Sequence, residues 1–236
     1  MSQSLPTLPS KKSAQLLSKR LMLIDSLVSD NYQHIWDCCC DHGYLGQHLA
    51  HRGAAPRVHF VDIVPEIIAQ LKEKLQGRED VPSQMHVYCC DVALLPLNDF
   101  HHHDKHLIII AGVGGDLTLS MVKALVAEHP DKQLEFILCP LRQQVHLREQ
   151  LAGGGLSLLD EQLVKDDKLF YEVIHVTTGA GEPLIGIGSK LWQQPSEWHV
   201  EHLNIMLAHV KRMANNPHNN VAETIAAYQR IHDQLN

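Results

Sequence analysis

The stretch IWDCCCDHGYLG, residues 35–46, decides how the rest of the chain is interpreted. It opens with apolar residues suited to a buried strand and closes with a glycine and residues suited to the first turn of a helix. In α/β proteins a glycine-rich nucleotide turn is expected at such a junction, yet three consecutive cysteines stand here. The stretch is compatible with a metal site, a redox site or a cofactor turn.

Short apolar runs alternate with helical patterns from this turn onward. The strand candidates read HIWDCC, RVHFVD, MHVYCC, HLIIIA and LEFILC, and the helical patterns occupy 43–52, 64–76, 115–128 and 142–152. Parallel neighbours need a crossover connection, so repeated strand–helix units of this size predict a parallel sheet wrapped by helices. We therefore expect a doubly wound α/β fold.

The pattern changes after the fifth strand candidate. Glycines 153–155 end a helix, and the runs LSLLDEQLV and LFYEVIHVTT flank the polar turn KDDK, which predicts an antiparallel hairpin. Five parallel strands followed by a reversed hairpin resemble the layout of class I methyltransferases, a Rossmann-like fold with a mostly parallel seven-stranded sheet.

The two ends of the chain add further elements. Residues 1–12 are rich in Ser, Pro and Lys, which is typical of a flexible leader, and Ser13–Val28 carries apolar residues at helical spacing. Two apolar stripes separated by ANNPHN near the C-terminus predict a small helical hairpin. We divide the chain into a leader (1–12), a main domain (13–180), and a linker with a helical hairpin (181–236).

Composition narrows the class of protein. The apolar fraction is 44%, and no uncharged apolar run has the ~18 residues that a membrane span requires. The six cysteines lack the dispersed spacing of a disulfide framework, and the N-terminus lacks the pattern of a secretory signal, so we expect reduced thiols and a cytoplasmic location. The net charge of −7 gives no global sign of nucleic-acid binding, although the first 24 residues carry four basic residues and no acid.

A carboxylate stands at the end of each of the first three strand candidates. Asp37, Asp62 and Asp91 stand at these positions, and Asp62 follows Asp37 at a spacing suited to an acid that binds ribose hydroxyls. One such residue is more often a helix cap, but three together favour a ligand site, because ligands bind beyond the carboxyl ends of parallel strands.

These residues belong to motifs through which the chain resembles the bacterial tRNA (adenine-22-N1)-methyltransferases of the TrmK type. The resemblance covers most of residues 16–178. Its motifs are LSKRL at 17–21, DCCCDHGYL at 37–45, IIIAGVGG at 108–115 and the LREQL…LFYEVI stretch at 147–174. The family has a glycine where Cys39 stands here, and tends to have Gln-Pro-Asn in place of residues 139–141.

The resemblance implies S-adenosylmethionine as the cofactor and a methyl transfer to N1 of an adenine in tRNA. The residues that it places around the cofactor are Asp37, Cys39, Asp41, His42, Gly43, Tyr44, Leu45, Asp62, Ile63, Asp91, Val92, Ala111, Gly112 and Val113. The residues expected near the transferred methyl group are Asp41, Gly112, Gly114, Gly115 and Pro140. Glycines suit that place because a target base must approach closely. No general base is expected, since adenine N1 carries an in-plane lone pair.

A tRNA substrate needs cations for its phosphates, and a paired target base would have to be extruded from its helix. The candidate RNA-binding residues are Lys11, Lys12, Lys19, Arg20, Arg142 and Arg148. The helical hairpin fits two interpretations equally well: it could bind RNA, or it could be a packing or dimer element.

Neither the cysteine run nor the segment FHHHDKH, residues 100–106, predicts a metal site. Successive side chains on an extended chain point to opposite sides, so the side chains of either run converge on one ion only with an unusual backbone. A redox-sensing thiol at Cys40 stays open, although a cofactor-binding role for its backbone is favoured. Three functions stay open: a tRNA adenine-N1 methyltransferase, a methyltransferase acting on another nucleotide or a small molecule, and a non-catalytic protein that binds the cofactor or RNA.

Overall fold

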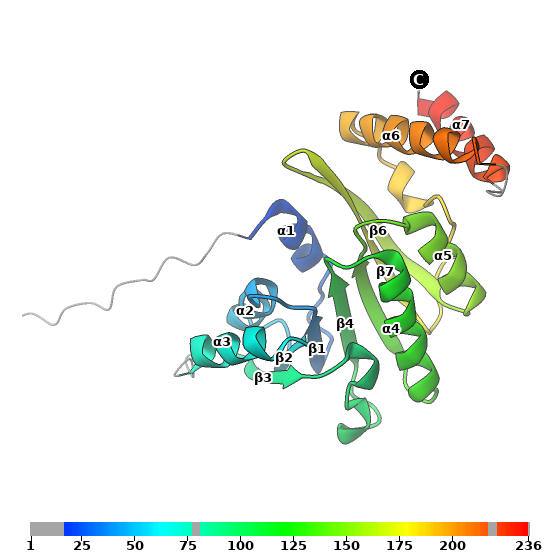
Figure 1. The fold of residues 1–236 in the computed structure, drawn as a ribbon. Coiled ribbons are helices and arrows are strands. Elements are labelled where there is room, and N and C mark those ends of the chain that lie inside the picture. Colours follow the sequence, from blue (N-terminus) through cyan, green and yellow to red (C-terminus); the bar gives the residue numbers. More distant parts are fainter. Residues whose placement is uncertain (1–16, 77–80, 217–220, 236) are drawn as a thin grey trace, which may run out of the picture.

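The computed structural model describes residues 17–76, 81–216 and 221–235. A seven-stranded sheet forms its centre, with strand order β3-β2-β1-β4-β5-β7-β6 (Figure 1). The first five strands are parallel and the last two form a reversed hairpin, which confirms the predicted fold class. The strands are β1 (His34–Cys38), β2 (Arg57–Asp62), β3 (Gln84–Cys89), β4 (His106–Ala111), β5 (Leu134–Cys139), β6 (Ser157–Asp166) and β7 (Leu169–Thr177).

Helices cover both faces of the sheet. One apolar layer joins the sheet to α1 (Lys19–Ser26), α2 (Tyr44–His51) and α3 (Pro65–Leu75). The other joins it to α4 (Gly115–Glu128), α5 (Gln144–Gly153) and the short turns η1 (Val92–Leu94) and η2 (Leu97–Asp99). Along β4, Leu107 and Ile109 enter the first layer while Ile108 and Ile110 enter the second. The unbroken apolar run in this strand follows from burial on both faces.

Helix α1 is shorter than the predicted helix over Ser13–Val28, of which residues 13–16 lie outside the described residues. The Ser18 hydroxyl accepts a hydrogen bond from the amide of Leu21 at 3.4 Å and caps the helix start. At the other end, the Arg52 guanidinium donates to the carbonyls of Asp25 and Val28 at 3.3 and 3.0 Å. These bonds give further partners to carbonyls at and just after the C-terminal end of α1.

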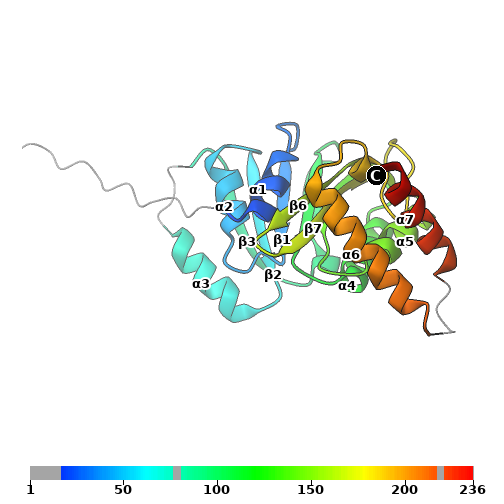
Figure 2. The same ribbon diagram turned by 90° about the horizontal axis from the view of Figure 1, so that it is seen from above.

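The C-terminal helices α6 (Glu197–Met213) and α7 (Ala222–Leu235) lie side by side, as predicted, after the short turn η3 (Lys190–Trp192) (Figure 2). Their shared apolar cluster includes Leu203, Leu207 and Tyr228, and it also contacts Trp192. No helix among the described residues is both long and apolar enough to span a bilayer.

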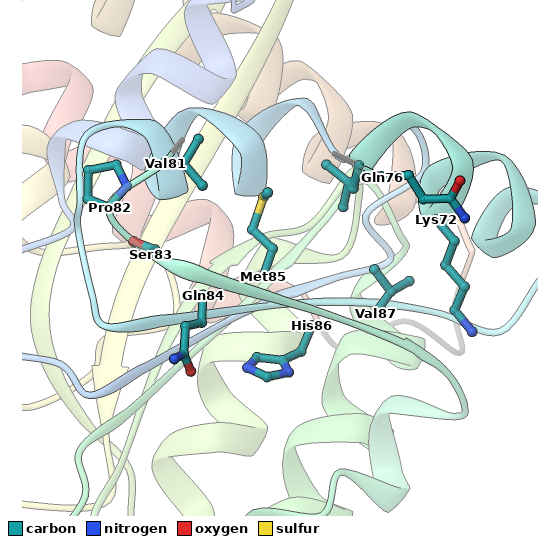
Figure 3. Close-up of a pocket in the computed structure, with 10 residues that line it drawn as sticks. Lys72, Gln76, Val81, Pro82, Ser83, Gln84, Met85, His86 and Val87 are labelled. Atoms are coloured by element: carbon teal, nitrogen blue, oxygen red, sulfur yellow. The ribbon is translucent and has the colours of Figure 1, made fainter. Parts of the chain in front are cut away.

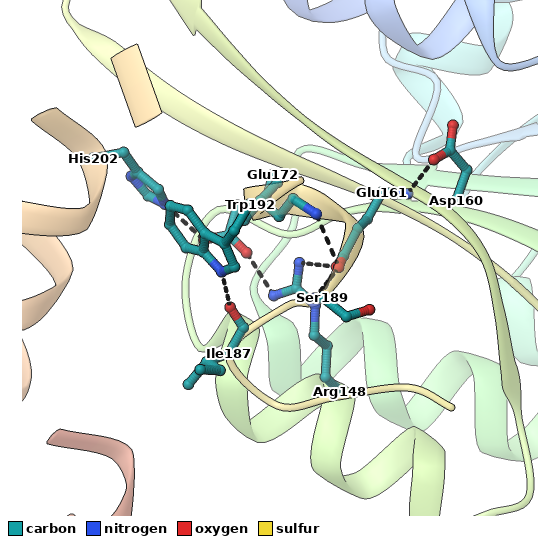
Figure 4. Close-up of polar contacts among 9 residues, drawn as sticks. Arg148, Asp160, Glu161, Glu172, Ile187, Ser189, Trp192 and His202 are labelled. Atoms are coloured by element: carbon teal, nitrogen blue, oxygen red, sulfur yellow. Dashed lines mark hydrogen bonds and ion pairs between the residues drawn. The ribbon is translucent and has the colours of Figure 1, made fainter. Parts of the chain in front are cut away.

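A buried polar network joins these helices to the sheet (Figure 4). The Arg148 guanidinium of α5 forms ion pairs with Glu161 of β6 at 2.9 Å and with Glu172 of β7 at 2.5 Å. His202 of α6 contacts the other oxygen of Glu172 at 2.7 Å, and the amide of Leu191 in η3 donates to Glu161 at 3.2 Å.

The division of the chain into a main domain and a C-terminal part at residue 180 stays a prediction.

The prediction that Arg148 binds RNA is wrong. Its side chain is 1% exposed, because the face of α5 that carries Leu147 and Leu151 packs on the sheet and takes Arg148 with it. Two carboxylates already neutralise the guanidinium there, so it has no free charge for a phosphate.

Four histidines form a stacked row across the neighbouring strands β3, β2, β1 and β4. The ring centroids of His86 and His59 lie 5.2 Å apart, those of His59 and His34 5.2 Å, and those of His34 and His106 4.7 Å. His59 also stacks on Trp36 at 3.8 Å. Burial lowers the pKa of His59 to about 2 and the pKa of His106 to about 3, so the row is neutral in the folded protein.

This row predicts a loss of stability in mild acid. The folded pKa values lie below the unfolded value of ~6.5, so stability is fully present above that pH and declines as the unfolded chain alone takes up protons. Between about pH 7.5 and about pH 5.5 these histidines should lower the free energy of unfolding by roughly 1 kcal/mol or more, measured by urea titration. Burial raises the pKa of the Asp37 carboxyl to about 7, which has the opposite effect in this interval, so the measurement compares wild type with His59→Phe. An equal pH dependence of the two proteins would contradict the neutral row.

Candidate functional site

The first turn of the site joins β1 to α2. The side chain of Asp37 is buried, and one of its carboxylate oxygens accepts a hydrogen bond from the amide of Gly46 at 2.8 Å. Burial raises the pKa of this carboxyl to about 7. Asp37 therefore fixes the start of α2 to the end of β1, and its side chain is 5% exposed.

Three residues of this turn have left-handed backbone conformations. Cys39 has φ 56°, Asp41 has φ 46° and Gly43 has φ 66°. A Cβ on Gly43 would lie 2.8 Å from Leu71 and 3.0 Å from Phe60, so only glycine fits there. Cys39 occupies a conformation that glycine adopts without strain, which gives a physical reason for a glycine at this position in similar turns.

The side chains of the turn have different exposures. His42 is exposed, Tyr44 is half-buried, and Leu45 is buried in the core beneath the turn. The Lys74 ammonium of α3 lies 4.4 Å from the ring centroid of Tyr44 and donates to the carbonyl of His42 at 3.3 Å. The turn is thus held by α3 on its outer side.

Asp62 at the end of β2 connects two segments of the site. Its carboxylate accepts hydrogen bonds from the amides of Asp41 at 3.3 Å and Val64 at 3.1 Å. Ile63 is 64% exposed beside it, and Leu94, which follows β3, is 74% exposed. A carboxylate with remaining lone pairs beside exposed apolar side chains suits a ribose and a flat ring.

Asp91 and Val92, which follow β3, have different structural roles. The Asp91 carboxylate accepts from the amide of Ala93 at 2.9 Å and caps η1, while Val92 is buried in the second apolar layer. The helix-cap interpretation of Asp91 thus holds in the structure, and its second oxygen is available to a ligand.

The glycine loop after β4 faces the other side of the turn. Gly112 has φ 88° and is exposed, and Ala111 and Val113 flank it in half-buried positions. A Cβ on Gly115 would lie 2.8 Å from the carbonyl oxygen of Arg142, so the close approach of this loop to the segment after β5 requires glycine.

The segment after β5 is fixed against this loop. The amide of Leu141 donates to the carbonyl of Val113 at 2.9 Å, Pro140 is buried, and Leu141 is 51% exposed. The exposed side chain at this rim is therefore apolar.

Two of the predicted RNA-binding residues flank the glycine loop. An Arg20 nitrogen lies 3.7 Å from the place of a Cβ on Gly112, and the Arg142 Nε lies 3.3 Å from the place of a Cβ on Gly114. Lys19 is exposed at the start of α1. Lys11 and Lys12 lie outside the described residues.

The cysteines at the end of β1 and in the turn after it are free thiols, of which Cys38 is buried and Cys39 and Cys40 are half-buried. No group of three His, Cys, Asp or Glu side chains is arranged to hold a metal ion in residues 17–76, 81–216 and 221–235. Burial raises the pKa of the Cys38 and Cys40 thiols, and raises the pKa of Cys39 to about 11, so these thiols stay protonated and unreactive.

A pocket of about 830 Å³ lies elsewhere, between α3 and the outer strand β3 (Figure 3). Its lining includes Lys72, Met85 and Val87 and contains none of the predicted site residues. Its lining also includes Gln76 and Val81, and we assign no role to it.

Leu94 and Tyr171 belong to the candidate site by position, and sequence reasoning did not predict them. Tyr171 comes from β7, and the Arg20 guanidinium lies 5.1 Å from its ring centroid. The aromatic pair in LFYE at the hairpin was the available signal, but nothing local to β7 shows that the strand reaches α1.

The family described as "Methyltransferase domain" matches residues 17–174. The chain belongs to this methyltransferase family. A curated relative in Mycoplasma pneumoniae, named "Putative tRNA methyltransferase", is 26% identical over 162 residues, which cover 68% of this chain and 71% of the relative.

Solved structures share the fold of this methyltransferase. Sp1610 of Streptococcus pneumoniae, in complex with S-adenosyl-L-methionine, is similar with a TM-score of 0.74 and 21% identity, over 92% of this chain and 100% of that one. The m1A22 tRNA methyltransferase TrmK of B. subtilis gives a TM-score of 0.67 and 19% identity, over 93% and 95% of the two chains. TrmK of M. capricolum, in complex with S-adenosyl-homocysteine, gives a TM-score of 0.71 and 18% identity, over 91% of this chain and 94% of that one.

The left-handed turn predicts different effects of the same substitution at two adjacent cysteines. Cys39→Gly should leave the free energy of unfolding within about 1 kcal/mol of wild type, because relief of backbone strain offsets the greater chain entropy of glycine. Cys38→Gly should lower it by about 2 kcal/mol, because a fully buried strand side chain is lost. Urea unfolding of both variants tests this, and equal destabilisation would contradict the left-handed turn.

Proposed function

We propose that this methyltransferase uses S-adenosyl-L-methionine to methylate N1 of an adenine in cytoplasmic tRNA. The observation that carries the proposal is the arrangement at one edge of the sheet: the Asp62 carboxylate lies on one side of the turn, and an open glycine loop between two arginines lies on the other. The names of the similar proteins, which include tRNA m1A22 methyltransferases, support the choice of substrate.

The residues present fit the cofactor. Asp62 would accept hydrogen bonds from the ribose hydroxyls, Ile63 and Leu94 would pack on the adenine, and Asp91 with the amide of Val92 would meet the adenine edge. The turn around Cys39, Asp41, His42 and Tyr44 would hold the methionine part, and Ala111–Val113 would complete the site. Bound S-adenosyl-L-methionine supplies an electrophilic methyl group.

The protein contributes position more than acid–base chemistry. Adenine N1 has a lone pair in the plane of the ring, so no residue has to remove a proton before methyl transfer. Gly112 and Gly114 add no side chain of their own beside Arg20 and Arg142, and the close approach of Gly115 to the carbonyl of Arg142 fixes the loop from behind. Holding two reactants in line can contribute roughly 7–11 kcal/mol. The carboxylate of Asp41, exposed at this turn, can favour the positive charge that the base gains.

Asp62 gives a test of cofactor binding that is independent of the RNA. Asp62→Asn keeps an acceptor for one backbone amide but loses the charge and a ribose acceptor, so the Kd for S-adenosyl-L-methionine should rise about 10–100-fold. Isothermal titration calorimetry measures it. Asp131→Asn removes the same charge from an exposed position before β5 and should leave Kd unchanged. An unchanged Kd in Asp62→Asn would remove Asp62 from the site.

The reaction itself is tested with total tRNA from a strain that lacks the gene. Incubation with labelled S-adenosyl-L-methionine followed by nucleoside mass spectrometry should show 1-methyladenosine. Tight cofactor binding with no methylated nucleoside, or with a different one, would contradict the proposed function.

A further inference from the structure

The strongest positive feature of the site is a pair of arginines beside the glycine loop. Arg20 comes from α1 and stands over Gly112, while Arg142 comes from the segment after β5 and stands over Gly114. The two guanidinium groups therefore flank the place where a target base would enter.

Neither of these arginines is neutralised by the protein. Within the described residues, no carboxylate oxygen lies within 4.0 Å of a side-chain nitrogen of Arg20 or Arg142. Arg52 and Arg148, by contrast, pair with Asp25 at 2.8 Å and with Glu161 at 2.9 Å. Unpaired guanidinium groups beside a ligand site are suited to bind an anion.

The proposed reaction decides which part of an RNA these arginines meet. The adenine gains positive charge as the methyl group arrives, so a guanidinium in direct contact with the ring would oppose the transfer. Backbone phosphates, which keep their negative charge throughout, are the partners that both arginines can bind without this cost.

Arg20 is held in place by the β6–β7 hairpin. The pairing of β7 with β5 stops at Ile174, opposite Leu138, so residues 169–173 extend past this pairing. Figure 1 shows the tip of this hairpin between α1 and α6. The Tyr171 ring lies under the Arg20 guanidinium at 5.1 Å, and Asp166 accepts a hydrogen bond from the backbone amide of Arg20 at 3.1 Å.

We propose that Arg20 and Arg142 bind the two phosphates that flank the extruded adenine, and that Tyr171 is a positioning residue that holds Arg20 over Gly112. The proposal rests on the proposed function and adds which part of the substrate the site grips. It also assigns these two arginines a role that differs from that of cations that bind the outer surface of an RNA.

Steady-state kinetics with tRNA test the role of Tyr171. Arg20→Gln and Tyr171→Leu should each raise KM for tRNA about tenfold and leave KM for S-adenosyl-L-methionine unchanged. Tyr171→Phe keeps the ring face and should restore the wild-type KM. The double variant Arg20→Gln with Tyr171→Leu should be no worse than Arg20→Gln alone. Additive effects in the double variant, or a Phe variant as weak as the Leu variant, would overturn the positioning role.

Lys123→Gln provides the matched control. It removes one positive charge from α4, about two turns after Gly115. Lys123 is exposed there and contacts Gln150. Its KM for tRNA should equal that of wild type, whereas an increase as large as that of Arg20→Gln would overturn the local role of Arg20.

A neutral backbone tests the phosphate contact itself. tRNA carrying a single methylphosphonate on the 5′ or the 3′ side of the modified adenine should raise KM about tenfold with wild type. When the enzyme carries Arg20→Gln or Arg142→Gln, one of the two methylphosphonates should cause no further increase in KM. Additive losses for both linkages in both variants would overturn the phosphate contact. Failure to form 1-methyladenosine with wild type and unmodified tRNA would instead refute the proposed function.

Discussion

The position of β1 between β2 and β4 is the constraint on which the rest of the molecule depends. Both neighbours pair with it in parallel, so the ends of these strands meet at one edge of the sheet. The chain must leave β1 through a turn confined between the residues after β2 and β4, and the left-handed Cys39 and Asp41 allow it to do so. The Asp62 carboxylate then joins the turn to β2 through the amide of Asp41.

The fold and most of this edge were predictable from the sequence because the signals are local. Short apolar runs and patterns of period 3.6 located the strands and helices, and the reversed hairpin followed from KDDK between two apolar runs. Asp37, Asp62 and the glycines after β4 lie at the strand ends that parallel pairing brings together. The cysteine run, which did not predict a metal site, consists of the buried Cys38 and the half-buried Cys39 and Cys40 in the turn after β1.

The remaining features depend on contacts between distant segments. Arg148 looked like a free cation on α5, but its partners come from β6 and β7, 13 and 24 residues away. Tyr171 and Arg20 are separated by most of the main domain, and only the extension of the hairpin past β5 brings them together. The histidine row arises in the same way, because four strands each contribute one ring.

Hydrogen–deuterium exchange of the full chain, with and without S-adenosyl-L-methionine, tests the central claim most directly. The account predicts that the cofactor slows exchange at the amides of residues 39–46, 62–64, 91–93 and 112–115, which lie at one edge of the sheet. Protection confined to residues 82–87, beside the pocket between α3 and β3, or no protection at the four strand ends, would contradict it.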